Sequence, residues 1–443
     1  MSRCLRLPWS LGALPGRRNV QLVWLSTFIC SAGMSVWQGQ LLSIYLFHMV
    51  VADTEQIGYI EGVQGLTQLV IGFATGWAVD KFGASRRNLL MQISTVYTLV
   101  VLGFCGFCVL YVKAPWAWYV CCCLFAPSVS IQRSIVESLF ADSVPTGVRV
   151  KDYTTKRLCQ LSGQLAAPLL QACIFSFSGL DDAWTPQNLT MLMLLGIAIT
   201  SVGCVFQMLM DQHNTLGAQS EALQVQLPHA SLDGNPATPD TEEQQTIRCN
   251  SSDGPAIESL PQSNLERKAL HVRWTILVYD IVRVSFGGMA VKFYGLFFTE
   301  VFGVTPITYM WLQVLTMLAM VIFAKIGGGL CDLGFPRTGT CFAMLLLNNI
   351  GNFTIGYGTR LEADAAGWIL REGALNGVFH LKQTILMDHT PKATRGIWNS
   401  VDSLNSSFWS GSAVFGGWLV RRYGYRTNFI VMSWGFTLGT LTW

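Results

Sequence analysis

The sequence has little charge for its length. Only 12% of its 443 residues are Asp, Glu, Lys or Arg, whereas a typical soluble domain carries about 25%. Hydrophobic residues make up 51% of the chain. They fall in blocks of about 20 residues, the length that crosses the hydrocarbon core of a bilayer. These features exclude an ordinary soluble fold, and we expect an all-α integral membrane protein.

Motifs for catalysis are also missing. The sequence has no glycine-rich loop ending in Gly-Lys-Ser or Gly-Lys-Thr, so we expect no nucleotide hydrolysis. No nucleophile–base pair or metal-ligand cluster stands out, and most of the 13 cysteines lie in apolar segments, where they pack as small residues. We therefore expect no enzyme, no metal and no cofactor. Basic residues gather at segment ends rather than in patches with aromatics, which argues against nucleic-acid binding.

Twelve apolar segments divide into two sets of six. The segment between the sets, residues 211–268, is rich in Ser, Gln, Pro, Thr and acidic residues and has no apolar period, which predicts a disordered cytosolic linker. We expect a cytosolic tail at 1–19, an N-terminal bundle at 20–210 and a C-terminal bundle at 269–443. The expected spans are 20–49, 57–79, 88–112, 116–141, 156–178, 189–210, 270–298, 305–327, 338–358, 365–387, 400–420 and 426–443.

Positive charge is distributed unequally between the two ends of these spans. With the N-terminus inside, 18 basic residues fall in inner segments and only five in outer loops. Basic residues concentrate on the cytosolic side of membrane proteins, so a cytosolic N-terminus is predicted. Three of the five outer residues, Arg421, Arg422 and Arg426, lie close together and run against the rule.

Short motifs repeat in the same order in the two halves. At near-constant offset they predict a duplicated six-helix unit. The matched pairs are Gly33–Met34 with Gly288–Met289, Gly76-x-x-x-Asp80 with Gly328-x-x-x-Asp332, and Asp142-x-x-Pro145-x-x-x-Arg149 with Asp388-x-x-Pro391-x-x-x-Arg395.

The segment after the second span resembles the signature of the major facilitator superfamily, Gly-x-x-x-Asp-Arg/Lys-x-Gly followed by basic residues. The resemblance implies twelve transmembrane helices in two pseudo-symmetric six-helix bundles that alternate access to a central cavity. It implies a cavity lined mainly by the first, fourth, seventh and tenth helices, and a cytoplasmic gate locked by Asp80 and Asp332. The expected gate residues are Gly76, Asp80, Lys81, Gly83, Arg86, Arg87, Asp142, Arg149, Asp332, Arg337, Asp388 and Arg395.

Charged residues inside the spans are the candidates for a solute site. Such charges are costly in lipid and usually face the bundle interior or a water-filled cavity, although each could instead form a static pair between helices. Arg371 and Glu372 are expected near the outer end of the tenth span, within reach of solvent. The substrate-binding candidates are Arg133, Arg283, Lys292, Lys382 and Tyr294, and the proton-coupling candidates are Glu137, Asp280 and His380.

The balance of these buried charges favours an anionic ligand, because six basic residues within the spans face four acidic ones. We expect a secondary active or facilitative transporter of a small solute, with an organic anion favoured and coupling to protons left open. It would work as a monomer in a plasma or organelle membrane. The alternative is a transporter-like sensor or scaffold that acts through the cytosolic linker.

Overall fold

The computed structural model describes residues 17–82, 87–144, 149–177, 181–211, 215–216, 262–389 and 408–443. All regular elements in this part of the chain are helices. Most of the expected tail at 1–19 and of the expected linker at 211–268 lies outside the described residues.

The first half supplies the six expected N-terminal spans. The first span is broken between Trp37 and Gln40, so that it forms one long and one short helix. Pro115 and Pro186 begin helices, where a missing N–H costs nothing, and Thr185 caps the second of these by accepting from the Asn188 N–H. The helices are α1 (Arg17–Trp37), α2 (Gln40–Met49), α3 (Thr54–Phe82), α4 (Arg87–Tyr111), α5 (Pro115–Ser143), α6 (Arg149–Phe177) and α7 (Pro186–Met208).

The second half repeats this arrangement. Its first span is also broken, between Val291 and Tyr294. The last helix changes direction at Gly424, whose φ of 84° and ψ of 168° are readily adopted by glycine and rarely by other residues. The expected spans 400–420 and 426–443 therefore meet at this kink. The helices are α9 (Gln262–Val291), α10 (Tyr294–Phe302), α11 (Pro306–Asp332), α12 (Arg337–Tyr357), α13 (Leu361–Asp388) and α15 (Ala413–Thr442).

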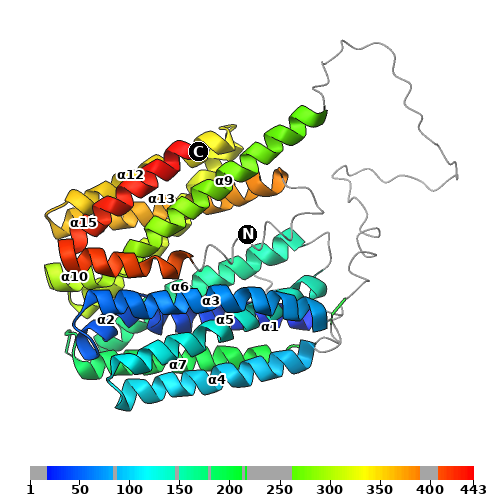
Figure 1. The fold of residues 1–443 in the computed structure, drawn as a ribbon. Helices are drawn as coiled ribbons and strands as arrows, with labels where there is room; N and C mark the ends of the chain where they lie inside the picture. Colours follow the sequence, from blue (N-terminus) through cyan, green and yellow to red (C-terminus); the bar gives the residue numbers. More distant parts are fainter. Residues whose placement is uncertain are drawn as a thin grey trace, which may run out of the picture.

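The duplication extends to the packing inside each half. In the first half α3 packs on α5, α5 on α4, and α4 on α7. The corresponding helices of the second half pair in the same way: α11 packs on α13, α13 on α12, and α12 on α15. Figure 1 shows the result as two bundles, α1–α7 below and α9–α15 above. The two-bundle prediction is confirmed.

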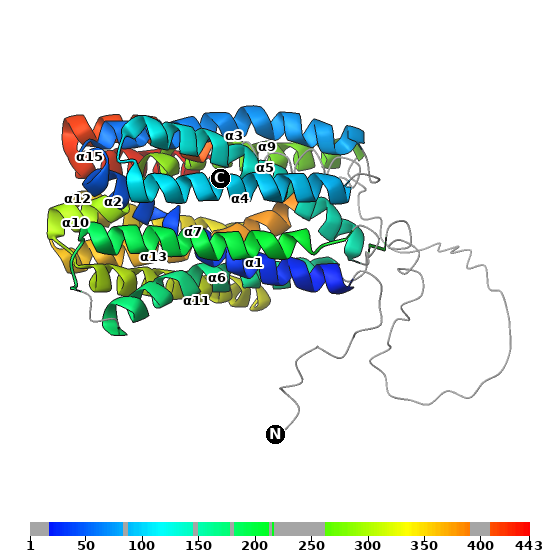
Figure 2. The ribbon, with the colours of Figure 1, turned by 90° about the horizontal axis from the view of Figure 1, so that it is seen from below.

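The bundles meet along two matching contacts, α3 against α15 and α6 against α11, and Figure 2 shows α6 beside α11. The first contact is a glycine seam, formed by Gly58, Gly62 and Gly417. A Cβ on Gly58 would lie 2.6 Å from the Ala413 carbonyl oxygen, so the two backbones touch almost directly. At one end of the molecule α2 also packs on α10. We call this the short-helix end and the opposite end, where α7 stops and α9 starts, the linker end (Figure 1).

The chain is a multi-pass membrane protein. By length and apolarity alone, six segments of the described residues could cross a membrane. Several of the other expected spans are less apolar because they carry charged side chains, as α9 does with Asp280 and Arg283. Exposed aliphatic residues such as Val70 and Val100, each more than 60% exposed, belong in lipid. The six segments are Arg17–Met49, Asn88–Tyr111, Pro115–Ser143, Asp152–Phe177, Pro186–Met208 and Pro306–Asp332.

Candidate functional site

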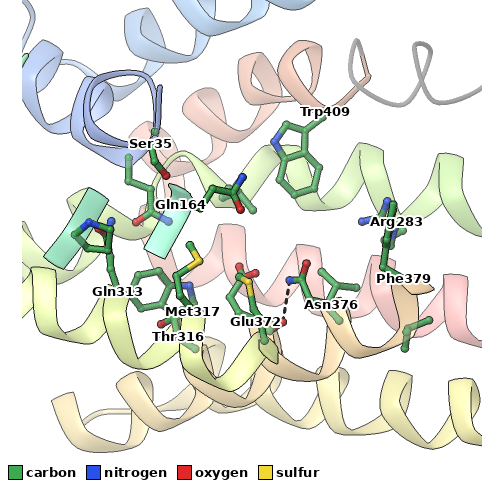
Figure 3. A pocket seen from close by; sticks show the side chains of 18 of the residues that line it. Ser35, Gln164, Arg283, Gln313, Thr316, Met317, Glu372, Asn376, Phe379 and Trp409 are labelled. Carbon is green, nitrogen blue, oxygen red and sulfur yellow. Dashed lines mark hydrogen bonds between the residues drawn. The ribbon is translucent and has the colours of Figure 1, made fainter. Parts of the chain in front are cut away.

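A cavity of about 380 Å³ is lined by residues of both bundles (Figure 3). The first half contributes α1, the start of α2, and α6. The second half contributes α9, α11, α13 and Trp409. Small-molecule sites in proteins usually measure about 300–1,000 Å³, and such a place between two mobile halves is typical of transporters. This cavity is therefore the candidate solute site.

Three basic side chains and one carboxylate are the charged groups that line the cavity in the described part of the chain. Arg157 comes from α6, Arg283 from α9, and both Lys382 and Glu372 from α13. Arg157 donates to Gln160 Oε1 at 2.8 Å, and its guanidinium carbon lies 5.3 Å from the ring centroid of Phe379 in the other bundle. The cavity therefore carries positive charge from both bundles.

Asp280 joins two of these cations. It is 6% exposed, it accepts a hydrogen bond from Lys382 Nζ, and its Oδ1 lies 3.5 Å from Arg283 Nε. Three residues that the sequence singled out, Asp280, Arg283 and Lys382, thus form one cluster between α9 and α13. Among the described residues the cluster holds one carboxylate and two cations, of which Lys382 is buried and Arg283 is partly exposed.

Arg371 and Glu372 form a second charged pair on α13. The sequence places them within reach of solvent; the structure corrects this, since Arg371 is 0% exposed. Its Nε donates to Asn352 Oδ1 at 3.1 Å and its guanidinium contacts Glu372. The Arg371 side chain is buried because α12 and α13 approach each other closely here. A Cβ on Gly351 of α12 would lie 2.8 Å from the backbone nitrogen of Arg371. Figure 3 shows Glu372 and Asn376 pointing from α13 into the cavity, opposite Trp409.

Lys292, predicted to bind substrate, lies outside the cavity lining. Its Nζ is 2.9 Å from Glu61 Oε2, and the Glu61 side chain is 0% exposed. Glu61 belongs to α3 and Lys292 follows α9, so this ion pair joins the two bundles. The sequence shows Glu61 as a charge within a span but does not reveal its partner, 231 positions away.

The fourth span takes no part in the cavity. Arg133 of α5 is exposed and is not a lining residue, and Glu137 forms an ion pair with Lys156 of α6. The resemblance implies a cavity lined by the first, fourth, seventh and tenth helices. Among the described residues the first, seventh and tenth do contribute, but the fifth (α6) and eighth (α11) replace the fourth.

Tyr294 lies in a stack of aromatic rings behind the cavity. Its ring is 4.7 Å from that of Phe429 at 7°, and 5.8 Å from that of Trp368 at 21°. Trp368 in turn stacks on Tyr309 at 6.1 Å and 11°. Of these rings Trp368 reaches the cavity wall. Tyr294 therefore supports a lining residue rather than facing the cavity itself.

The predicted gate residues that fall in described helices lie at helix ends on the linker side. Asp332 ends α11 and Arg337 begins α12, and both are exposed; Asp142 is in the last turn of α5. Gly76, Asp80, Lys81, Arg87, Arg149 and Asp388 lie in helices, but their side chains are outside the described residues, as is that of His380. Gly83, Arg86 and Arg395 lie wholly outside them.

At the short-helix end the two bundles are held together by polar contacts. Arg421 Nη1 lies 3.0 Å from Asp53 Oδ2 and 2.7 Å from Glu55 Oε2. Trp184 Nε1 donates to the Val304 carbonyl at 2.8 Å. These contacts give a reason for Arg421 at the end of the molecule that has fewer basic residues: the carboxylates of Asp53 and Glu55 in the other bundle compensate its charge.

Known structures show what this fold is. No family model and no curated protein sequence matches the chain, but solved transporter structures match nearly all of it. A D-xylose–proton symporter shares 14% identity over 96% of this chain and 97% of its own, with a TM-score of 0.67. A POT family transporter in complex with 5-aminolevulinic acid shares 12% over 96% and 95%, with a TM-score of 0.67.

The human organic anion transporter MFSD10 (TETRAN) also matches, with 15% identity over 97% of this chain and 99% of its own and a TM-score of 0.58. At such low identities these likenesses show the fold alone. The chain has the fold of major facilitator superfamily transporters, as its signature motif predicts.

Proposed function

We propose that this protein is a transporter that carries a small organic anion across the membrane by alternating access between its two bundles. The observation that supports the proposal is the cavity: both bundles line it, and among its described lining residues the cations outnumber the carboxylates. The fold supports transport, and the charge selects the class of solute.

The charge argument includes the partners behind the lining. Arg371 stands against Glu372, and Asp280 stands between Arg283 and Lys382. Among the described residues, and counting Arg157 as well, four cations stand against two carboxylates. A solute anion about 4 Å from one cation gains roughly 4 kcal/mol at an effective dielectric constant near 20, before its desolvation is subtracted. A neutral solute gains nothing comparable.

The Asp280 cluster also supports coupling to protons. An anion that binds Lys382 and Arg283 competes with Asp280 for the same two cations. Asp280 then loses its counter-charges while buried, and the cost of burying a lone carboxylate favours its protonation. Solute anion and proton would therefore move together, which is symport.

The orientation follows from the basic residues. We propose that the linker end faces the cytosol, because the basic residues concentrate in the segments expected there. The contacts at the short-helix end would then hold the outer side closed. One chain forms the whole cavity, so a monomer is sufficient for transport.

Uptake into proteoliposomes tests the proposal. A panel of labelled carboxylates and a neutral sugar would be offered with and without an inward proton gradient. We expect uptake of at least one carboxylate, stimulated by the gradient, and no uptake of the sugar. Arg283→Gln should abolish uptake, whereas the matched control Arg360→Gln, which removes an exposed arginine, should not. Equal uptake by the two variants, or uptake of the sugar alone, would refute the anion site.

A further inference from the structure

One aromatic ring of the cavity wall differs from the others. In the described part of the chain four aromatic residues line the cavity, and three of them have another ring or a cation against their own ring. These are Trp368 with Tyr294, Phe379 with Arg157, and Tyr279 with Lys382. For the fourth, Trp409, the described residues supply neither a stacked ring nor a cation. Its side chain is partly exposed, and Figure 3 shows it across the cavity from Glu372 and Asn376. The Trp409 ring is therefore available to a solute.

The backbone of α9 fixes the position of this ring. A Cβ on Gly287 would lie 2.9 Å from Cζ3 and 3.5 Å from Cη2 of the Trp409 indole, so the ring rests directly against this glycine. A Cβ on the next residue, Gly288, would overlap the Trp409 carbonyl oxygen, so the two backbones also touch. A ring that is already held in place loses little freedom when a solute packs on it.

A cation lies one helical turn from this ring. Arg283 precedes Gly287 by four residues, which places both on one face of α9, with their Cα atoms about 6 Å apart along the helix axis. Arg283 lines the cavity together with Lys382. An acid group at Arg283 and an apolar group on Trp409 can therefore belong to one small solute.

The chemistry of the wall favours an aromatic ring over an aliphatic group of similar size. Aromatic rings pack on an indole in offset-stacked or edge-to-face arrangements, and such pairs are worth more than the apolar area that they bury. Met317 and Met320 of α11 line the same cavity, and the thioether sulfur of methionine also makes favourable contacts with aromatic rings. A saturated ring buries at least as much surface but gains neither contact.

An ammonium group would also be attracted to the Trp409 ring, because the face of an indole is negative. Glu372 stands across the cavity, but its carboxylate already contacts the Arg371 guanidinium. Among the described lining residues the cations outnumber the carboxylates. The charge of the cavity therefore favours an anion over an ammonium group.

We propose that the cavity binds an aromatic carboxylate, whose ring packs on Trp409 and whose acid group lies at Arg283. The dimensions of 3-phenylpropanoate suit this arrangement. Three carbon–carbon bonds of about 1.5 Å carry its acid group roughly 4 Å beyond the edge of the ring, and the arginine side chain spans the remaining distance. This proposal rests on the proposed transport of organic anions and narrows the solute to anions with an aromatic ring.

The test compares 3-phenylpropanoate with 3-cyclohexylpropanoate, 3-phenylpropanamide and 2-phenylethylammonium. Their binding to the full chain in lipid nanodiscs would be measured by calorimetry, with empty nanodiscs to subtract partition into lipid. We expect 3-phenylpropanoate to bind about twofold to tenfold tighter than 3-cyclohexylpropanoate, the worth of one aromatic pair. Burial of apolar surface alone predicts the reverse order, because the saturated ring has the larger apolar surface. The amide and the ammonium compound should bind more weakly than either acid.

Substitutions at and beside the ring assign the preference. Trp409→Leu should remove the preference for the aromatic acid, whereas Trp409→Phe, which keeps a ring, should retain part of it. Gly287→Ala should reduce the preference, since the added Cβ displaces the indole. The preference is a ratio within one preparation, so a loss of folded protein does not alter it. The controls Trp434→Leu and Gly329→Ala change an exposed ring and a glycine with open space around it, and should leave the preference unchanged.

The outcomes separate the two proposals. If the two acids bind equally and more tightly than the amide, or if the preference survives in Trp409→Leu, the aromatic site is wrong while anion binding stands. If 2-phenylethylammonium binds more tightly than both acids, Trp409 and Glu372 form a cation site and both proposals fall. If neither acid binds better than the amide, the anion site itself is refuted.

Discussion

Replacing Glu61 by glutamine should open the short-helix end. The Lys292 ammonium would lose the carboxylate that lies 2.9 Å from it, in a site where the lysine side chain is 13% exposed. Breaking a buried pair by removing one partner costs about 3–5 kcal/mol, because the remaining charge stays buried without compensation. The pair joins the two bundles, so this cost falls on the form in which α2 and α10 are in contact.

A penalty of about 3 kcal/mol changes the ratio of the two forms by a factor of roughly 150. Hydrogen exchange measured by mass spectrometry should therefore show faster exchange in α2 and α10 of Glu61→Gln. The charge swap Glu61→Lys with Lys292→Glu should restore much of the protection, since it rebuilds the pair. The control Lys156→Gln breaks a pair inside one bundle, with Glu137, whose side chain is 43% exposed.

That control should leave exchange in α2 and α10 unchanged. If Glu61→Gln behaves like the control, the ion pair does not hold the bundles together and the reasoning fails. If Glu61→Gln and Lys156→Gln both exchange faster throughout the chain, both variants have lost global stability. The charge swap then distinguishes the loss of the ion pair from a general loss of folding.

Three further substitutions test the site and the packing. Asp280→Asn should abolish stimulation of anion uptake by a proton gradient while anion binding persists or tightens; uptake that still follows the gradient would place coupling elsewhere. Arg371→Met leaves Glu372 with an uncompensated charge, so thermal unfolding should show a loss of about 3–5 kcal/mol. Gly416→Ala would push a Cβ into the backbone of α9 and should cost about 1–3 kcal/mol. Its control Gly328→Ala points into open space and should stay within ~1 kcal/mol of wild type; equal unfolding temperatures would contradict the packing argument.

The sequence predicts much of the fold because each span carries its own signal. Apolar length marks the helices, and the repeated motifs mark the two halves. The matching pairs of motif glycines also have a structural reason, since Gly33 and Gly288 each lie where another helix crosses closely. These signals are local or repeated, so a single sequence contains them.

The site could be predicted only in part. Asp280 and Arg283 are close on one helix, and their meeting with Lys382 follows from two spans that both face the interior. Helical spacing shows which face a charge occupies but not which distant helix will cover it. For that reason the partner of Lys292 and the burial of Arg371 could not be foreseen, and Arg133 could not be told from a cavity residue.

The glycine seam between α3 and α15 has a consequence for the energy of opening. Surfaces built from Gly58, Gly62 and Gly417 present few side-chain atoms, so parting them exposes little apolar area and frees few rotamers. Separating this seam therefore requires little free energy from the burial of apolar side chains. The ion pairs beside the seam, Lys292 with Glu61 and Arg421 with Asp53 and Glu55, then contribute more to holding these two helices together, and the resting position of the halves becomes sensitive to the loss of a single charge.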